Sequence, residues 1–80
     1  MKARVYVTLK KTVLDPQGQT IQQALAGLGY RSITEVRQGK VFDLELDGLT
    51  REQARAEVER MAREVLTNPV IEEYHYELEE

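Results

Sequence analysis

Two segments of this chain each carry one narrow apolar stripe at helical spacing. Between Ala54 and Leu66 the apolar residues recur at steps of three and four, which predicts an amphipathic helix. The segment from Ile21 to Leu28 follows the same pattern. Because a helix with one apolar stripe buries one side only, we expect both helices to cover the same face of a sheet.

The other apolar residues alternate with polar ones, as in strands with one buried face. This alternation occurs in residues 3–10, 33–37, 41–46 and 70–78. Gln38-Gly39 predicts a tight hairpin, since glycine reaches positive φ without a Cβ clash, and its register sets Ile33 opposite Leu44 and Val36 opposite Val41. The expected inner-face residues are Phe42, Leu44, Leu46, Tyr74, Tyr76 and Leu78.

Helix ends are marked by short polar signals. Capping boxes are expected at Thr20 with Gln23 and at Thr50 with Gln53. Gly29 is placed just past the first helix, and Pro69 stops the second. The resulting order, β-α-β-β-α-β over residues 1–80, predicts one domain of the α+β class. It is a two-layer ferredoxin-like sandwich with an antiparallel four-stranded sheet and two helices on one face. The first and third strands are expected in the centre of the sheet and the last strand at an edge.

Size and charge limit the function classes. The chain has 80 residues and no cysteine, so its core is small and disulfides are excluded, which favours association. Its net charge is −3, without a basic block, which argues against nucleic-acid binding. No run approaches the length of a membrane span and no signal peptide opens the chain, so we expect no membrane contact and a cytoplasmic location.

Few residues of the sequence are candidates for catalysis or for ligand binding. Ser32 has no neighbour that would activate it as a nucleophile. His75 is interpreted as a surface or interface histidine. The clustered glutamates are interpreted as solvated charges, and they are residues 57, 59, 72, 73, 77, 79 and 80. No glycine-rich loop has phosphate-binding spacing. We therefore predict no catalytic residue, no metal site and no cofactor in this chain, which is expected to act by binding.

Three groups are candidates for partner contacts. Arg37 and Lys40 flank the predicted hairpin turn, where together they would meet a phosphate or a partner's carboxylate. Tyr74 and Tyr76 suit a protein interface. The third group is the stretch from Val13 to Gly18, with Leu14, Asp15, Pro16 and Gln17 between them. Its last four residues fit a type I turn. Two interpretations stay open: the stretch closes one end of the core, or it is a preformed docking loop.

Several short motifs occur in a fixed order: VLDPQG from Val13, LGY from Leu28, VRQGK from Val36 and NPVIEEY from Asn68. In this order they resemble the PurS family, the small subunit of bacterial phosphoribosylformylglycinamidine synthase. The resemblance extends over essentially the whole chain. It implies a complex that converts formylglycinamide ribonucleotide, glutamine and ATP to formylglycinamidine ribonucleotide, glutamate, ADP and phosphate.

The resemblance also implies a division of labour. A large PurL-type synthetase subunit would use ATP and magnesium, and a PurQ-type glutaminase subunit would release ammonia. The chain itself, as a homodimer or homotetramer, would bridge these subunits without catalytic residues. The alternative is a regulatory module of the ACT type, which has the same element order and binds a small ligand between the copies of a homodimer.

Overall fold

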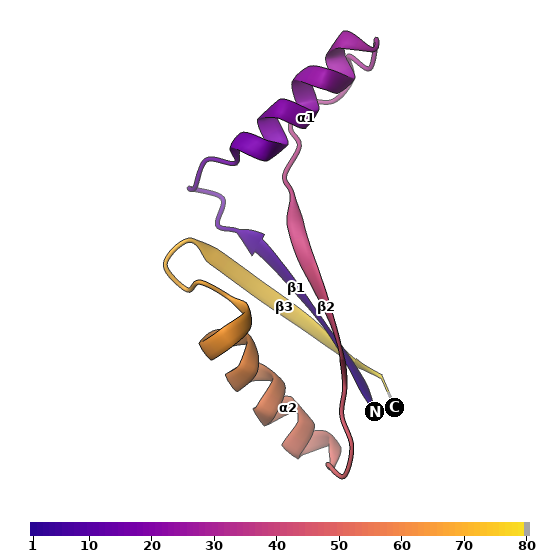
Figure 1. Cartoon of the computed structure of the whole chain (residues 1–80), viewed down its shortest axis with the longest axis vertical. Coiled ribbons are helices and arrows are strands. Elements are labelled where there is room, and N and C mark those ends of the chain that lie inside the picture. Colours follow the sequence, from indigo (N-terminus) through magenta and orange to yellow (C-terminus); the bar gives the residue numbers. More distant parts are fainter. Residues whose placement is uncertain (80) are drawn as a thin grey trace.

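The computed structural model describes residues 1–79, so Glu80 of the predicted acidic tail lies outside the described residues. The elements are β1 (Lys2–Leu9), α1 (Pro16–Gly27), β2 (Gly39–Glu45), α2 (Arg51–Met61), a π-helical turn η1 (Ala62–Leu66) and β3 (Glu72–Glu79). Figure 1 shows two parts. The body consists of β1, β2, α2, η1 and β3. The arm consists of α1 and residues 28–34 and projects from one end.

The sheet has three antiparallel strands in the order β2-β1-β3. Strand β1 is central because Ala3, Val5 and Val7 are buried beneath α2. Val5 lies opposite Phe42 on β2 and opposite Tyr76 on β3. The predicted inner face is confirmed, since its six residues pack partly buried against this core. The central position of the first strand and the edge position of the last are also confirmed.

The predicted fourth strand is wrong. In the described chain, residues 33–37 form no strand, and the segment runs straight into β2 at Gly39. The Gln38-Gly39 hairpin, with Ile33 opposite Leu44 and Val36 opposite Val41, is therefore also wrong. Val41 pairs with Tyr6 of β1 instead, and β2 lies at an edge of the sheet.

Gly39 has a different purpose from the one expected. Its φ is not positive. A Cβ at this position would lie 2.7 Å from the carbonyl oxygen of Val7 and 2.8 Å from the methyl carbon of Thr8. Real Cβ atoms essentially never come this close to other atoms. The glycine is thus needed for the close approach of β2 to β1 and makes no turn.

The first helix begins earlier than expected. Asp15 is its N-cap and Pro16 occupies the first turn, an arrangement that proline favours because its fixed φ suits this position. The capping box at Thr20 is wrong, because the Thr20 hydroxyl donates to the carbonyl of Pro16 within the helix (3.0 Å). Gly29 follows the helix with φ of 101°, which confirms its place beyond the C-terminal end.

The second helix follows the prediction at its start and departs from it at its end. Thr50 and Gln53 form the expected capping box. The α-helical part ends at Met61, and the chain continues as the π-helical turn η1. A π turn has wider spacing than an α turn, so the stripe loses its phase: Ala62 is buried but Val65 is 78% exposed.

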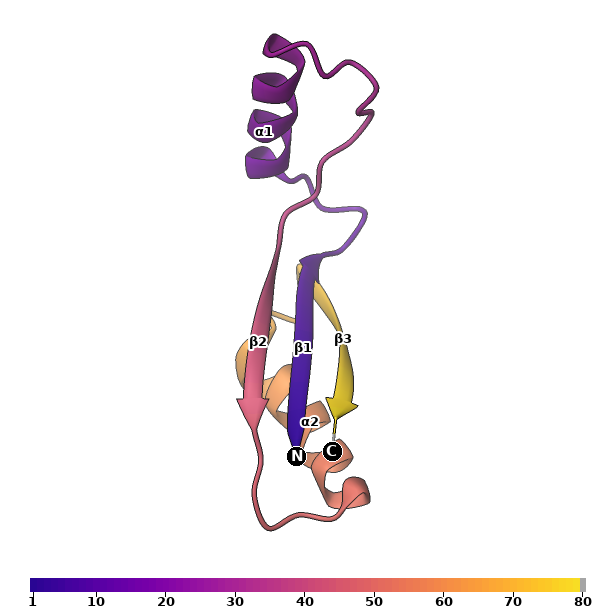
Figure 2. The same ribbon diagram turned by 90° about the vertical axis from the view of Figure 1, so that its right-hand side faces the viewer.

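The position of α1 corrects the expected layers. Only α2 covers the sheet, whereas α1 lies beyond the end of the strands (Figures 1 and 2). The molecule is accordingly elongated, with extents of 50, 26 and 14 Å. Two helices on one face would require the chain to fold back at residue 38, and the contacts described next hold it extended there.

Candidate functional site

Two chain segments connect the arm to the body, and we call them the neck: residues 10–18 and 35–40 (Figure 2). Most of the sequence-predicted partner residues lie here. One carboxylate links the two segments. The Asp15 Oδ1 atom accepts from the backbone N–H of Gly18 (2.8 Å), and Oδ2 accepts from that of Gln38 (2.7 Å). Asp15 therefore caps α1 and also fixes the entry to β2.

Asp15 is a buried charge with suitable partners. Its residue is only 3% exposed, and the two N–H donors, with Arg37 nearby, compensate for the loss of water. The N–H of Gln38, followed by that of Gly18, lowers the pKa of the Asp15 carboxyl below its ordinary value. The group is therefore ionised throughout the neutral range.

Gly18 is buried where the two neck segments touch. A Cβ at Gly18 would overlap the backbone carbonyl oxygen of Val36. Next to it, the Gln38 side-chain amide donates to the Gln17 side-chain oxygen (2.9 Å). The glycine thus permits helix α1 to contact the opposite backbone directly.

Arg37 is used within the neck. Its Nη2 donates to the carbonyls of Lys10 (3.0 Å) and Val13 (2.8 Å). Its Nε lies 3.7 Å from the carboxylate of Glu35. Both carbonyls belong to the loop that follows β1, so Arg37 holds that loop against the start of β2.

Lys40 has a different partner within the chain from those of Arg37, and contact of the two with another protein stays a prediction. Its Nζ lies 3.5 Å from a carboxylate oxygen of Glu72 on β3 and 6.0 Å from the centre of the Phe42 ring. The pair was predicted to meet one phosphate or carboxylate at a hairpin turn. The turn does not exist, and the two side chains are occupied by different partners inside the chain.

The remaining neck residues divide by exposure. Val13 is half-buried, and Pro16 and Gln17 are exposed. Leu14 is 64% exposed, although it stands between Val13 and the buried Asp15. Leu14 is therefore a large apolar side chain of the VLDPQG stretch that is free to contact another protein.

The two tyrosines lie elsewhere. Tyr74 and Tyr76 belong to β3 and are half-buried on the inner face of the sheet. The Tyr76 hydroxyl donates to the Glu59 carboxylate of α2 (2.8 Å). Burial first, and then this carboxylate, raise the pKa of Tyr76. Tyr76 thus ties β3 to α2, and its contact with a partner stays a prediction.

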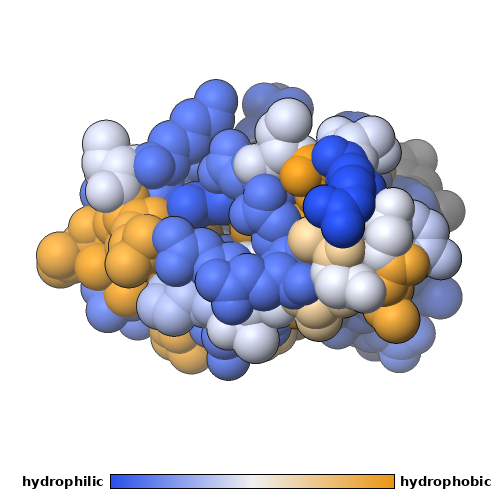
Figure 3. Space-filling model, turned by 90° about the horizontal axis from the view of Figure 1, so that it is seen from above, coloured by the Kyte–Doolittle hydropathy of each residue, from blue (hydrophilic) through white to orange (hydrophobic). Residues whose placement is uncertain are grey.

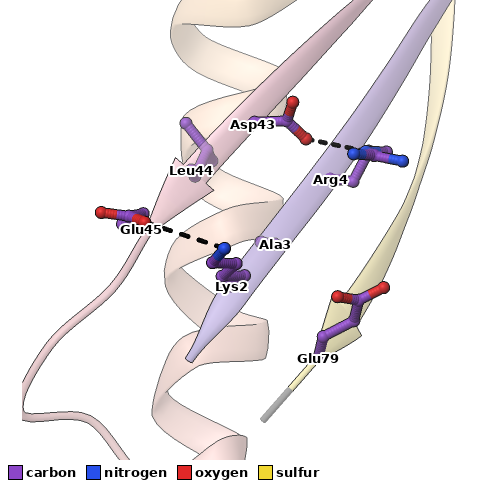
Figure 4. A pocket seen from close by; sticks show the side chains of 7 residues that line it. All are labelled: Lys2, Ala3, Arg4, Asp43, Leu44, Glu45 and Glu79. Atoms are coloured by element: carbon purple, nitrogen blue, oxygen red, sulfur yellow. Dashed lines mark hydrogen bonds and ion pairs between the residues drawn. The ribbon is translucent and has the colours of Figure 1, made fainter.

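The outer face of the sheet carries paired charges and one aromatic stack. Tyr6 of β1 stacks on His75 of β3, with ring centres 4.5 Å apart. Figure 4 shows a shallow hollow on this sheet, of about 210 Å³. In it Arg4 binds Asp43 (2.7 Å) and Lys2 approaches Glu45 (4.0 Å). Both basic side chains of this hollow are thus already paired with carboxylates, so it is a poor site for an anion.

Sequence reasoning missed the role of Gln38 and the double role of Asp15. The Asp-Pro pair is a helix-start signal that could have been found. The long-range bond to Gln38 has no local signal. Within residues 1–79, no group of three or more potential metal ligands occurs, and no helix is long and apolar enough to cross a membrane.

Comparison with known proteins covers the whole chain. The profile of the PurS family, described as phosphoribosylformylglycinamidine (FGAM) synthase, matches residues 2–80. The chain belongs to the PurS family. Phosphoribosylformylglycinamidine synthase subunit PurS of Methanocaldococcus jannaschii is 44% identical over 78 residues, which are 98% of this chain and 94% of the relative.

Solved PurS structures agree with this fold. A crystal structure of Bacillus subtilis PurS has a TM-score of 0.89 at 43% identity and covers 99% of this chain and 98% of its own. A chain in the structure of PurLQS from Thermotoga maritima has a TM-score of 0.87 at 33% identity and covers 95% and 93%. The path of this chain as a whole is therefore close to that of these PurS chains.

Proposed function

We propose that this chain is the bridging, non-catalytic subunit of a phosphoribosylformylglycinamidine synthase. The observation that carries the proposal is the whole-chain likeness to PurS, including a chain of a PurLQS structure. By this likeness its partners are a large PurL-type synthetase subunit and a PurQ-type glutaminase subunit. The family match favours this function over the ACT-type alternative.

In this proposal the chain acts by positioning. The synthetase would use ATP and magnesium in the cytoplasm, and the glutaminase would supply ammonia from glutamine, while this chain binds no cofactor. Docking the two enzymes in one orientation shortens the path of ammonia and limits its loss to water. The neck suits such a role because its buried carboxylate and Arg37 fork fix the arm relative to the body.

Reconstitution tests the proposal. Synthetase and glutaminase subunits from the same organism are assayed with glutamine, ATP and formylglycinamide ribonucleotide, with and without this chain. We expect glutamine-dependent product formation to rise with added chain and to saturate at a fixed ratio. Ammonia-dependent formation by the synthetase should change much less. Equal glutamine-dependent rates with and without the chain would contradict the proposal.

A further inference from the structure

The π-helical turn η1 and the residue that follows it place two side chains in unfavourable surroundings. Val65 is apolar but 78% exposed, whereas Thr67 is polar but only 7% exposed. Among residues 1–79, no hydrogen-bond partner is present for the buried Thr67 hydroxyl. A buried hydroxyl without a partner destabilises a fold, and an exposed valine contributes no burial. The π turn is therefore not the path that these two side chains favour by themselves.

A continuous α-helix would exchange the two environments. Val65 comes seven residues after the buried Val58, about two helical turns, so it would lie on the same buried side. Thr67 comes nine residues after Val58, about two and a half turns, so its hydroxyl would point to water. An α-helical path through residues 62–67 would thus bury the valine and expose the threonine.

The turn that follows η1 has contacts that depend on where the helix ends. The carbonyl of Asn68 accepts from the N–H groups of Ile71 (3.2 Å) and Glu72 (2.7 Å). The Asn68 N–H donates to the Glu72 carboxylate (2.8 Å), and this bond is exposed to water. An exposed bond is exchanged for one to water at little cost. These contacts favour the π path without making it the only one.

The same turn contacts both segments of the neck. The Lys10 N–H donates to the carbonyl of Ile71 (2.9 Å). The second oxygen of the Glu72 carboxylate lies 3.5 Å from the Lys40 ammonium group. A shift at the end of α2 would therefore reach both segments that carry the arm.

The path of η1 also changes the surface of the molecule. Val65 is exposed in the π path, and so is Val70 in the turn, at 76%. Figure 3 shows apolar surface at its left edge, on the side where the turn before β3 lies in Figure 1. An α-helical path would withdraw Val65 from the surface. The apolar surface and the neck contacts would then change together.

We propose that residues 62–67 exchange between two registers. The major register is the π turn of this structure. The minor register continues α2 as an α-helix, with Val65 buried and Thr67 exposed, and the turn before β3 moves with it. Single π turns are frequent at functional sites in helices, and helix register shifts take microseconds to milliseconds. This conformational device is a property of the chain itself and does not depend on the proposed function.

NMR relaxation dispersion on the chain alone, at two protein concentrations, detects such an exchange. We expect exchange at the amides of residues 62–72 that is independent of concentration, and none at the capping box of Thr50 and Gln53. Flat dispersion in η1, the same exchange at the capping box, or exchange that grows with concentration would overturn the proposal.

The minor register has its own signature in saturation-transfer NMR. Thr67 is extended in the major register, with φ of −124° and ψ of 138°. Its minor-state ¹³Cα shift should therefore move to the helical range. A random-coil shift would indicate local unfolding in place of a second register and would contradict the assignment.

Two valine variants form a matched pair. Val65→Thr adds a hydroxyl to the side chain that the minor register buries, so the minor-state population should fall at least about fivefold. Val70→Thr makes the same change at an equally exposed position outside η1 and should leave this population unchanged. Both variants should melt like the unmodified chain. Equal minor-state populations in the two variants would overturn the proposal.

Thr67→Val tests the buried hydroxyl directly. The variant removes the unpaired group from the major register and keeps a side chain of similar shape. Its melting temperature should rise by about 5 °C, and its minor-state population should fall about fivefold. An unchanged or lower melting temperature, or an unchanged population, would show that this hydroxyl does not set the balance. All of these tests use the chain alone, so their failure is distinct from failure of the proposed function.

Discussion

The Asp15 carboxylate accepts a hydrogen bond of 2.7 Å from the backbone N–H of Gln38, 23 residues further along the chain. Its other oxygen caps α1 through Gly18 (2.8 Å). One side chain therefore holds the start of the helix and the start of β2 together. It is one of the contacts that hold the chain extended at residue 38.

The variant Asp15→Asn should keep the hydrogen bond to Gly18 and remove the one to Gln38. Asparagine is also a good N-cap, so its oxygen can still accept from Gly18, while its NH₂ group faces the Gln38 N–H as a second donor. We expect faster hydrogen exchange at Gln38 than at Gly18 and a melting temperature lower by about 5 °C. Asp47→Asn, at an exposed loop position, is the matched control. Unchanged exchange at Gln38 would show that the bond contributes nothing.

The stability of the folded chain should depend on pH through the titration of the Asp15 carboxyl group. Because its pKa is lowered in the folded chain, the unfolded chain binds more protons in acid, and stability falls as the pH decreases. The contribution is complete above the ordinary aspartate pKa of about 3.9 and disappears as the pH falls through the lowered value. Melting temperatures between pH 2 and 6 should therefore converge for the unmodified chain and Asp15→Asn at the acid end. A constant difference over this range would contradict the assignment.

Two glycines of α1 should respond in opposite directions to alanine. Gly18→Ala places a Cβ against the carbonyl of Val36, which should cost about 1–3 kcal/mol of unfolding free energy. At Gly27 no atom lies within 4 Å of the added Cβ, so Gly27→Ala should gain about 0.5–1 kcal/mol from helix propensity. Denaturant unfolding at one fixed protein concentration measures both. Stabilisation by both variants would mean that Gly18 does not contact Val36 in solution.

Local sequence patterns predicted those helices and strands whose formation depends on contacts within one segment of the chain. Alternation placed β1, β2 and β3, and the spacing of apolar residues placed both helices. The capping box at Thr50 was predicted because all of its contacts lie within four residues. Short-range signals of this kind are contained in the sequence itself.

The path of the chain at residue 38 was not predictable in this way. Gln38-Gly39 suits a hairpin, and the competing bond comes from Asp15, 23 residues away. The same extended path at residue 38 goes with the missing fourth strand and with the position of α1 beyond the sheet. The candidate residues were thus mostly in one place, the neck, but their partners were not those expected.

Tyr76→Phe tests the connection between β3 and α2. The variant loses the 2.8 Å bond to Glu59 and keeps the ring, so we expect a loss of about 1 kcal/mol of unfolding free energy. Tyr74→Phe, on the same strand and face, removes a hydroxyl from the neighbouring inward position and should matter less. A double cycle with Glu59→Ala, which removes the acceptor, should show coupling for Tyr76 only. Independent effects at Tyr76 and Glu59 would exclude the bond.

Variants of Leu14 and Arg37 distinguish a docking role of the neck from a role in the stability of the fold. Arg37→Lys loses the fork to the carbonyls of Lys10 and Val13, so its melting temperature should fall by several degrees. Leu14→Asn changes a side chain that is 64% exposed and should leave melting unchanged. If the stretch is a docking loop, Leu14→Asn should still raise the amount of chain needed for half-maximal glutamine-dependent activity about tenfold, equivalent to about 1.4 kcal/mol. Normal activity of this variant at every concentration would leave VLDPQG with its structural role alone.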